Sequence, residues 1–166
     1  GRHAPVMCEA RGAPVRLRLG VSYDGTDFAG WQRQVRARTV QGVLEEAIAA
    51  VTGDTGVTVV GAGRTDAGVH ATGQVAHFDT TWTRTRGCPA LERALNAVLP
   101  ADVAVSGVRL APPGFHARHS ALGRCYRYVV WTDSTRSPLL RRTTLHVPWA
   151  LDVPAMRRAA AEQGPA

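Results

Sequence analysis

The sequence has 166 residues, of which 45% are hydrophobic and 20% charged, a composition typical of a folded globular protein. Its net charge is +7, and all 20 basic residues are arginine, so catalysis through a lysine Schiff base is excluded. No apolar run reaches the roughly 18 residues that a membrane helix needs, and the first 14 residues show no apolar core of a secretory signal.

The first half of the chain predicts two strands around a helix. Residues 1–14 are rich in Gly, Ala, Pro and Arg, which indicates a disordered tail. Apolar and polar residues then alternate over Val15–Tyr23, which predicts a strand with one buried face. A helix is predicted from Val40 to Val51, because Thr39 can cap its start and Gly53 can end it. Val57–Val60 predicts a second strand.

The second half continues the alternation of strands and helices. A glycine-rich loop precedes a predicted third strand, Gln74–Phe78, and Pro89 opens a second helix. The remaining predicted elements are strands at Val103–Leu110, Cys125–Trp131 and Leu145–Trp149, and a helix at Met156–Gln163 capped by Asp152.

This order of elements is β-α-β-β-α-β with additional strands, the pattern of the ferredoxin-like split βαβ fold. We therefore expect an α+β protein with two layers, an antiparallel sheet and both helices on one face. The predicted organisation is a tail at residues 1–14, a main domain at 15–150 and the start of a further domain at 151–166.

The charge is unevenly placed along the chain. Residues 1–83 contain eight Arg and eight acidic residues, whereas residues 84–166 contain twelve Arg and five acidic residues. A basic half favours a surface for a polyanion such as nucleic acid. On charge alone, ordinary solvated arginines are about equally expected.

Three cysteines, Cys8, Cys88 and Cys125, form no CxxC pair and are odd in number. A disulfide framework or a zinc site is therefore not expected, and a reducing cytoplasm fits this pattern.

The segment Gly61–His70 has the most informative chemistry. It follows a predicted buried strand and places Asp66 between Arg64 and His70, among three glycines that permit close approach of the backbone. A carboxylate in such a loop can act as a nucleophile or a base. A tight turn in which Asp66 caps backbone amides is an alternative, and the residue types alone favour it.

Several segments, in this order, resemble the tRNA pseudouridine synthase A (TruA) family. The similar segments are Tyr23–Gln34, Thr39–Glu45, Gly63–Ala71, Gly73–Phe78, Phe115–Ala121 and Arg124–Tyr128, within a match from about Val15 to about Ala161. Several motifs in the family's order are far more specific than one motif alone.

The resemblance implies an isomerase that converts uridine to pseudouridine in the anticodon stem-loop of tRNA, at positions 38, 39 and 40, without a metal or cofactor. Asp66 matches the family's essential Asp, either as the nucleophile or as the group that starts glycosidic cleavage. Arg64 matches an Arg associated with base flipping and with pairing to that Asp. Tyr126 matches an active-site Tyr that packs against the target base, although a core aromatic on a strand is the alternative.

The resemblance also implies where RNA binds. The expected RNA-binding residues are Phe115, His116, Arg118, His119, Arg84, Arg124 and Arg136. Further arginines that are candidates for phosphate contacts are Arg86, Arg127, Arg141 and Arg142. For each single Arg, a solvated surface role is about as expected. Trp31 is expected to pack beneath the early loop, and His70 and His77 to have structural or hydrogen-bonding roles.

Family members are expected to be cytoplasmic homodimers that continue into a second, related domain, so this chain is expected to end near the start of that domain. One alternative is an RNA-binding module with the same fold but no turnover. Another is a glycoside hydrolase, which usually needs two cooperating carboxylates, whereas only Asp66 lies in a suitable loop.

Overall fold

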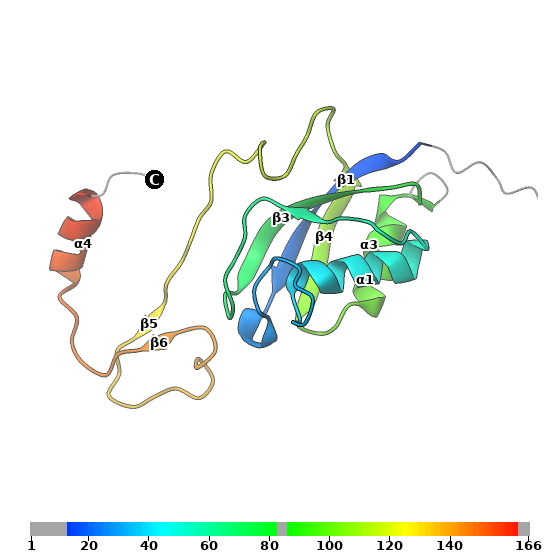
Figure 1. Cartoon of the computed structure of the whole chain (residues 1–166). Helices are drawn as coiled ribbons and strands as arrows, with labels where there is room; N and C mark the ends of the chain where they lie inside the picture. The colour runs from blue at the N-terminus through cyan, green and yellow to red at the C-terminus, as the bar shows by residue number, and fades with distance from the viewer. Residues whose placement is uncertain (1–12, 83–85, 163–166) are drawn as a thin grey trace, which may run out of the picture. The chain divides into compact units, whose positions relative to one another are not determined.

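The computed structural model describes residues 13–82 and 86–162. These fall into two units, a first that ends at Arg124 and a second that begins at Cys125, and each is described by itself (Figure 1). Most of the predicted tail at 1–14, and also Arg84, lie outside the described residues. The predicted domain boundary after residue 150 stays a prediction.

The first unit is built on one antiparallel sheet. Its strands are β1 (Val15–Tyr23), β2 (Val60–Gly61), β3 (Ala71–Thr80) and β4 (Val103–Leu110). They lie in the order β2-β3-β1-β4, and every adjacent pair is antiparallel. The expected split βαβ topology with an antiparallel sheet is therefore confirmed.

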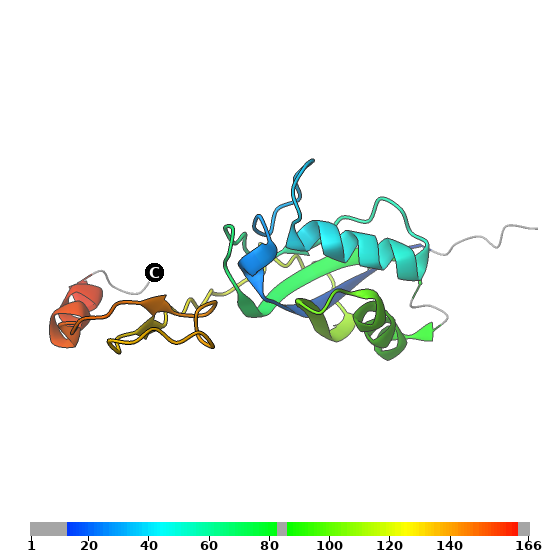
Figure 2. The same cartoon turned by 90° about the horizontal axis from the view of Figure 1, so that it is seen from below.

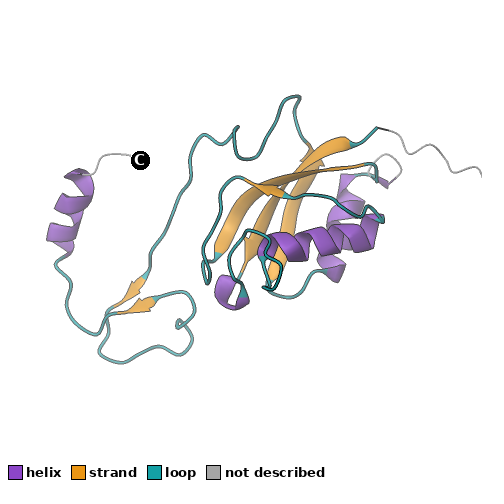
Figure 3. Cartoon of the chain, in the orientation of Figure 1, coloured by secondary structure: helices purple, strands orange, loops and turns teal. Residues whose placement is uncertain are grey.

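Two helices cover one face of this sheet, as Figures 2 and 3 show. Helix α1 (Val40–Thr52) begins where Thr39 accepts a hydrogen bond from the Gly42 amide, and ends at Gly53, whose φ of 74° is left-handed. Helix α3 (Cys88–Val98) has a proline in its first turn. Both helices were expected from the sequence.

The core lies between the helices and the sheet, because alternate residues of each strand point toward α1 and α3. Its buried members include Leu17, Leu19, Val21, Phe78, Leu44, Ile48, Leu91, Leu95, Val105 and Val108. Burial of these side chains is the main force that stabilises the first unit.

No described helix of the first unit covers the opposite face of the sheet. The alternate residues of β1, such as Arg16 and Arg18, belong to this face and are only partly buried. The segment 111–120 lies over one end of it, because the Ala111 amide donates to the Arg16 carbonyl at 2.9 Å and the Ala117 amide donates to His77 Nδ1 at 3.0 Å. The rest of this face is the floor on which the sites below are arranged.

The second unit differs from the sequence prediction. The predicted strand Cys125–Trp131 is wrong over residues 125–129, because only β5 (Val130–Trp131) pairs, in parallel, with β6 (Leu145–His146). The apolar residues in the unpaired stretch, including Tyr128, are exposed and have no strand beside them among the described residues. Strand β6 is likewise shorter than predicted, as is β2 in the first unit.

Helix α4 (Val153–Glu162) begins as expected after Asp152, whose carboxylate accepts a hydrogen bond from the Ala155 amide at 2.9 Å. No described residue of the second unit is buried. Among the helices that the structure describes, none combines the length and apolar character needed to cross a bilayer.

Candidate active site

The loop Gly61–His70, called here the Asp66 loop, connects β2 to β3. Its backbone is held at successive positions: the Ala62 amide donates to the Val75 carbonyl at 2.8 Å, and Gln74 Nε2 donates to the Gly63 carbonyl at 2.7 Å. The Val69 amide donates to the Asp66 carbonyl at 3.2 Å, which closes a turn at the carboxylate itself. The loop is therefore fixed by its own strand β3 on one side.

A second loop holds the other side of the Asp66 loop. The Trp31 amide donates to the Thr65 carbonyl at 2.9 Å, and the hydroxyl oxygens of Tyr23 and Thr65 lie 2.8 Å apart. The rings of Tyr23 and Trp31 are in contact, with centroids 6.1 Å apart. Trp31 is buried, so the expected packing role is confirmed. Thr65, directly before Asp66, is thus held through both its carbonyl and its side chain.

Two glycines make this close approach possible. A Cβ on Gly30, whose φ is 97°, would lie 2.6 Å from the Thr65 carbonyl oxygen. A Cβ on Gly61 would lie 2.7 Å from the Trp31 ring. Both distances are far inside van der Waals contact, so any larger residue at either position would push the two loops apart.

The loop that contains Trp31 is itself held in place by ion pairs. Arg38 donates to both oxygens of Asp102, at 2.7 and 2.9 Å, and its guanidinium lies 4.0 Å from the centre of the Phe28 ring. The hydrogen bond from Arg38 lowers the pKa of the Asp102 carboxyl. Arg33 pairs with the buried Glu45 of α1 at 2.5 Å.

Asp66 and Arg64 are both exposed. Within residues 13–82 and 86–162, the side chains of these two residues form no hydrogen bond or ion pair with each other. The pairing that the family resemblance implies is therefore not formed here, and the catalytic roles of both residues stay predictions. The geometry leaves the Asp66 carboxylate open to an incoming molecule while its backbone is fixed.

His70 closes the end of the Asp66 loop. Its Nδ1 lies 3.1 Å from the Gly25 amide nitrogen and 3.1 Å from the nearer carboxylate oxygen of Asp24. The expected hydrogen-bonding role of His70 is confirmed. A Cβ on Gly25 would lie 2.0 Å from the Val69 carbonyl oxygen, so glycine is required there too.

Arg124 lies against the Asp66 loop, which the sequence did not predict. Its Nε and Nη2 both donate to the Ala62 carbonyl, at 3.2 and 2.5 Å, and a Cβ on Gly63 would lie 2.9 Å from Nε. The residue was expected to contact RNA, and that role stays a prediction. The hydrogen bonds from Arg124 to the Ala62 carbonyl are a further contact that fixes the Asp66 loop.

The segment 115–119, expected to bind RNA, packs on β3 through a row of rings. The His116 ring centroid lies 4.7 Å from that of His77 and 4.3 Å from that of His119, while Phe115 meets His77 edge to face at 6.1 Å. His77 is 2% exposed, whereas His119 and Arg118 are exposed. The structure thus brings four of the predicted RNA-binding residues together in one exposed turn over His77.

Burial is the main cause that lowers the pKa of His77 to about 4, and the positive charge of Arg16 adds to it. His77 is therefore neutral at physiological pH, with Nδ1 free to accept the hydrogen bond from the Ala117 amide. The structural role expected for His77 is confirmed. The pKa of His116 is also lowered, chiefly by desolvation and by the neighbouring His119.

Tyr126 and Arg136 belong to the second unit and are exposed. Their roles toward Asp66 or RNA stay predictions. Among the described residues, no group of three or more His, Cys, Asp or Glu side chains could hold a metal ion.

Tyr23, Gln74 and the contact of Arg124 with Ala62 were missed by reasoning from sequence. The glycines at 25, 30 and 61 are the local sequence feature that marks the approach of another chain segment to this loop.

Comparison with known proteins agrees with this arrangement. The family model described as tRNA pseudouridine synthase matches residues 20–119, which include the loop with Trp31, the Asp66 loop and the turn over His77.

Similar proteins include the tRNA pseudouridine synthase A of Syntrophotalea carbinolica, 48% identical over 144 residues that cover 87% of this chain and 56% of that protein. The protein of the same name from Cronobacter sakazakii is 46% identical over 155 residues, 93% of this chain and 56% of the relative. The protein of the same name from Escherichia coli O9:H4 is 44% identical over 155 residues, which cover 93% of this chain and 56% of that relative. The chain thus spans about half the length of these curated relatives. Because the family model matches more than half of the chain, the chain belongs to the tRNA pseudouridine synthase family.

Proposed function

We propose that the protein is an isomerase that converts uridine to pseudouridine in the anticodon stem-loop of tRNA, at positions 38, 39 and 40. The observation that carries this proposal is the geometry of the Asp66 loop. The Asp66 carboxylate is exposed, and the backbone of its loop is hydrogen-bonded both to β3 and to the loop containing Trp31. The chain's membership of the family and its similarity to proteins named tRNA pseudouridine synthase A support the same reaction.

The reaction breaks the bond between ribose C1′ and N1 of uracil, and forms a bond between C1′ and C5. The proton on C5 is lost to solvent and N1 gains one, so atoms and charge balance without a metal, cofactor or oxidant. Asp66 would attack the nucleoside or start the cleavage of the glycosidic bond. A backbone fixed on both sides would help, because a reacting group that is already positioned lowers the entropy lost in the transition state.

The uridine must leave its stack before Asp66 can reach it. Arg64 is two residues from Asp66, exposed and unpaired among the described side chains, so its guanidinium is available to occupy the vacated space. Tyr126 would pack against the flipped base. The exposed turn with Phe115, His116, Arg118 and His119 would hold the RNA beside the loop, because aromatic and cationic side chains suit unstacked bases and phosphates.

The resemblance supports two further proposals, a homodimer and a cytoplasmic location. Arg84, Arg124 and Arg136 would add contacts to phosphates.

The proposed function is tested by tritium release from tRNA transcripts that are labelled at uridine C5. Release by the wild type and none by Asp66→Asn is expected, because the amide is isosteric but cannot act as a nucleophile. Glu46→Gln, which removes an exposed carboxylate on α1, is the matched control and should release tritium at the wild-type rate. The assay is run on the 166-residue chain and, if the encoded protein is longer, on its complete form.

Tritium release by Asp66→Asn at the wild-type rate would disprove the assigned role. Tight tRNA binding without release by any form, the complete protein included, would instead favour an RNA-binding module.

A further inference from the structure

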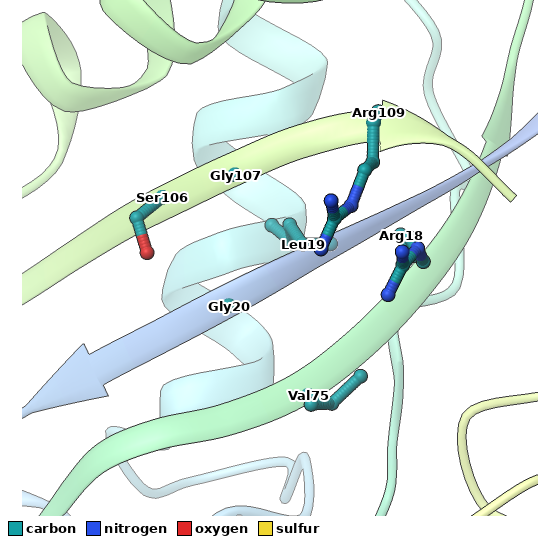
Figure 4. Close-up of a pocket in the computed structure, with 7 residues that line it drawn as sticks. All are labelled: Arg18, Leu19, Gly20, Val75, Ser106, Gly107 and Arg109. Carbon is teal, nitrogen blue, oxygen red and sulfur yellow. The ribbon is translucent and has the colours of Figure 1, made fainter.

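A pocket lies on the helix-free face of the sheet, where β1 and β4 run side by side (Figure 4). Its volume is about 200 Å³, and Arg18, Gly20, Ser106, Gly107 and Arg109 are among its lining residues. This volume suits a small polar group. Nothing in the proposed reaction uses these residues.

Within residues 13–82 and 86–162, neither arginine of this pocket forms an ion pair with an acidic side chain. Arg18 and Arg109 are direct cross-strand partners, and the neighbour of Arg18 on its other side is His77. Asp79, an acidic residue that β3 places opposite Arg16 on this face, is already held by Arg16 through hydrogen bonds of 2.8 and 3.0 Å. Like charges placed directly opposite in an antiparallel pair are destabilising, so the pairing of Arg18 with Arg109 is electrostatically unfavourable.

One donor in the pocket is buried without a partner. Arg18 Nε is shielded from solvent and makes no hydrogen bond to any described residue. A buried donor that lacks an acceptor is rare in folded proteins and destabilises them. An anion with several acceptor oxygens in the pocket would offset the repulsion between the two guanidiniums.

Glycines on both strands open the floor of the pocket. The register of β1 against β4 shifts between Arg18 and Gly20, and Gly107 has a φ of 61°, as a bulged strand requires. A Cβ on Gly20 would lie only 3.1 Å from Ser106 Oγ, so a larger residue there would crowd the serine. The bulge thus leaves room for an oxyanion between Arg18, Arg109 and the Ser106 hydroxyl.

The pocket is linked to the Asp66 loop through strands β3 and β1. Val75 lines it, and the Val75 carbonyl accepts the hydrogen bond from Ala62 of that loop. Along β1, Gly20 is three residues from Tyr23, about 10 Å at the usual rise of a strand, and Tyr23 contacts Thr65. A phosphate in the pocket would therefore lie within a few nucleotides of a uridine at Asp66.

We propose that this pocket, formed by Arg18, Arg109 and Ser106, binds a backbone phosphodiester of the RNA substrate near the target uridine. This inference rests on the proposed function. The site fixes the register of the RNA on the sheet and reads no base.

The test compares Arg18→Gln, Arg109→Gln and the double variant with Arg93→Gln, an exposed arginine on α3 that removes the same charge. Binding of an unmodified tRNA transcript is measured at several salt concentrations. Each pocket variant should weaken binding by roughly 5- to 10-fold, and the double variant should lower the slope of log affinity against log salt by about one. Arg93→Gln should change neither quantity by as much.

Pocket variants that bind tRNA as well as Arg93→Gln would overturn the proposal. Thermal unfolding without RNA provides a second readout: Arg109→Gln should melt at or above the wild-type temperature, because it relieves repulsion. If a Gln variant instead melts lower, Arg109→Lys is used, which keeps the charge and should keep most of the affinity. A loss of affinity in this folded Lys variant as large as that in Arg109→Gln would count against the site.

Stabilisation by inorganic phosphate, compared with tRNA binding, distinguishes a site for an RNA phosphodiester from a site for free anions. If millimolar phosphate stabilises the wild type while both pocket variants bind tRNA normally, the RNA assignment is wrong. Tritium release identifies which proposal has failed. Release by the wild type with normal tRNA binding by the pocket variants rejects the pocket alone, whereas pocket-dependent binding without release rejects the isomerase alone.

Discussion

Tyr23 and Thr65 join two loops at the residue that precedes Asp66, with their hydroxyl oxygens 2.8 Å apart. Loss of this hydrogen bond should cost about 1 kcal/mol, which corresponds to roughly a 5-fold decrease in kcat if the bond positions Asp66. We therefore predict that Tyr23→Phe and Thr65→Val each lower kcat for pseudouridine formation with little change in KM. Steady-state kinetics with tRNA measures both constants.

Thr65→Ser keeps a hydroxyl at this position and is the matched control, so its kcat should stay near that of the wild type. The double variant Tyr23→Phe/Thr65→Val should be no slower than the slower single variant, because both changes remove the same bond. Additive losses would show that the two hydroxyls act separately. An unchanged kcat in Tyr23→Phe would reject the positioning role.

His77 gives the native state a predictable dependence on pH. Its folded pKa of about 4 lies below the ordinary 6.5, so the unfolded chain takes up a proton first as the pH falls. The stability that the neutral ring contributes is present above pH 6.5 and is lost between pH 6.5 and 4. Allowing for partial solvation, this loss should be roughly 2 kcal/mol.

His77→Gln should lack this component. The difference in free energy of unfolding between the wild type and His77→Gln should therefore shrink by about that amount from pH 6.5 to pH 4. Urea denaturation at several pH values measures it. His119→Gln, which replaces an exposed histidine in the same turn, should keep the loss of stability between pH 6.5 and 4 that depends on His77. A constant difference between the wild type and His77→Gln would mean that His77 titrates normally.

At the scale of elements, the contact between β2 and the loop with Trp31 depends on the absence of one methyl group. A Cβ on Gly61 would lie 2.7 Å from the Trp31 ring, whereas one on Gly73 of β3 would meet no atom within 4 Å. We predict that Gly61→Ala lowers the free energy of unfolding by about 1 to 3 kcal/mol and that Gly73→Ala changes it by less than about 0.5 kcal/mol. Denaturant unfolding monitored by tryptophan fluorescence measures both.

Equal stability of these two alanine variants would show that the Trp31 ring moves aside without loss. Gly61→Ala should also lower kcat, because displacement of Trp31 would disturb its hydrogen bond to Thr65. Gly73→Ala should keep wild-type kinetics.

The elements that the sequence predicted well have their signals within their own residues. The alternation in Val15–Tyr23 specified β1 without reference to its neighbours, and Thr39 and Gly53 marked both ends of α1. The position of Asp66 in a loop between two strands could be predicted in the same way.

What the sequence could not predict depends on partners distant in the chain. Residues 125–128 have the composition of a strand but no strand beside them in the described structure, and Val129 contributes only its carbonyl, which accepts from the Leu145 amide. The contact from Arg124 to Ala62 joins residues 62 positions apart, and nothing local distinguishes this arginine from a solvated one. The same holds for Arg18 and Arg109, whose opposition appears only when the register of β1 and β4 is known.

For the whole molecule, burial is distributed unequally between the two units. The residues up to Arg124 contain the entire hydrophobic core that the structure describes, and no described residue after Arg124 is buried. Leu139, Leu145, Trp149 and Met156 are all more than half exposed. Because stability comes mainly from apolar burial, the first unit should account for nearly all of the free energy of unfolding of this chain.

This asymmetry makes a prediction for limited digestion with trypsin, which cleaves after arginine. Arg127, Arg136, Arg141 and Arg142 lie in the unit without a core and should be cut first, because cleavage requires local opening and opening there breaks few apolar contacts. The resistant product should end near Arg124 and keep β1, β3 and both helices. Mass spectrometry of the digest identifies it.

Hydrogen exchange gives an independent measure of the same property. Amides in the paired core of β1 and β3 should exchange on the timescale of global unfolding, while those of residues 125–162 exchange much faster. Early cuts at Arg16 or Arg18 in β1 would contradict the stability assigned to the first unit, whereas strong protection of α4 would show that the second unit has packing contacts of its own. A rise in protection of residues 125–162 when tRNA is added would instead place that unit at the RNA surface.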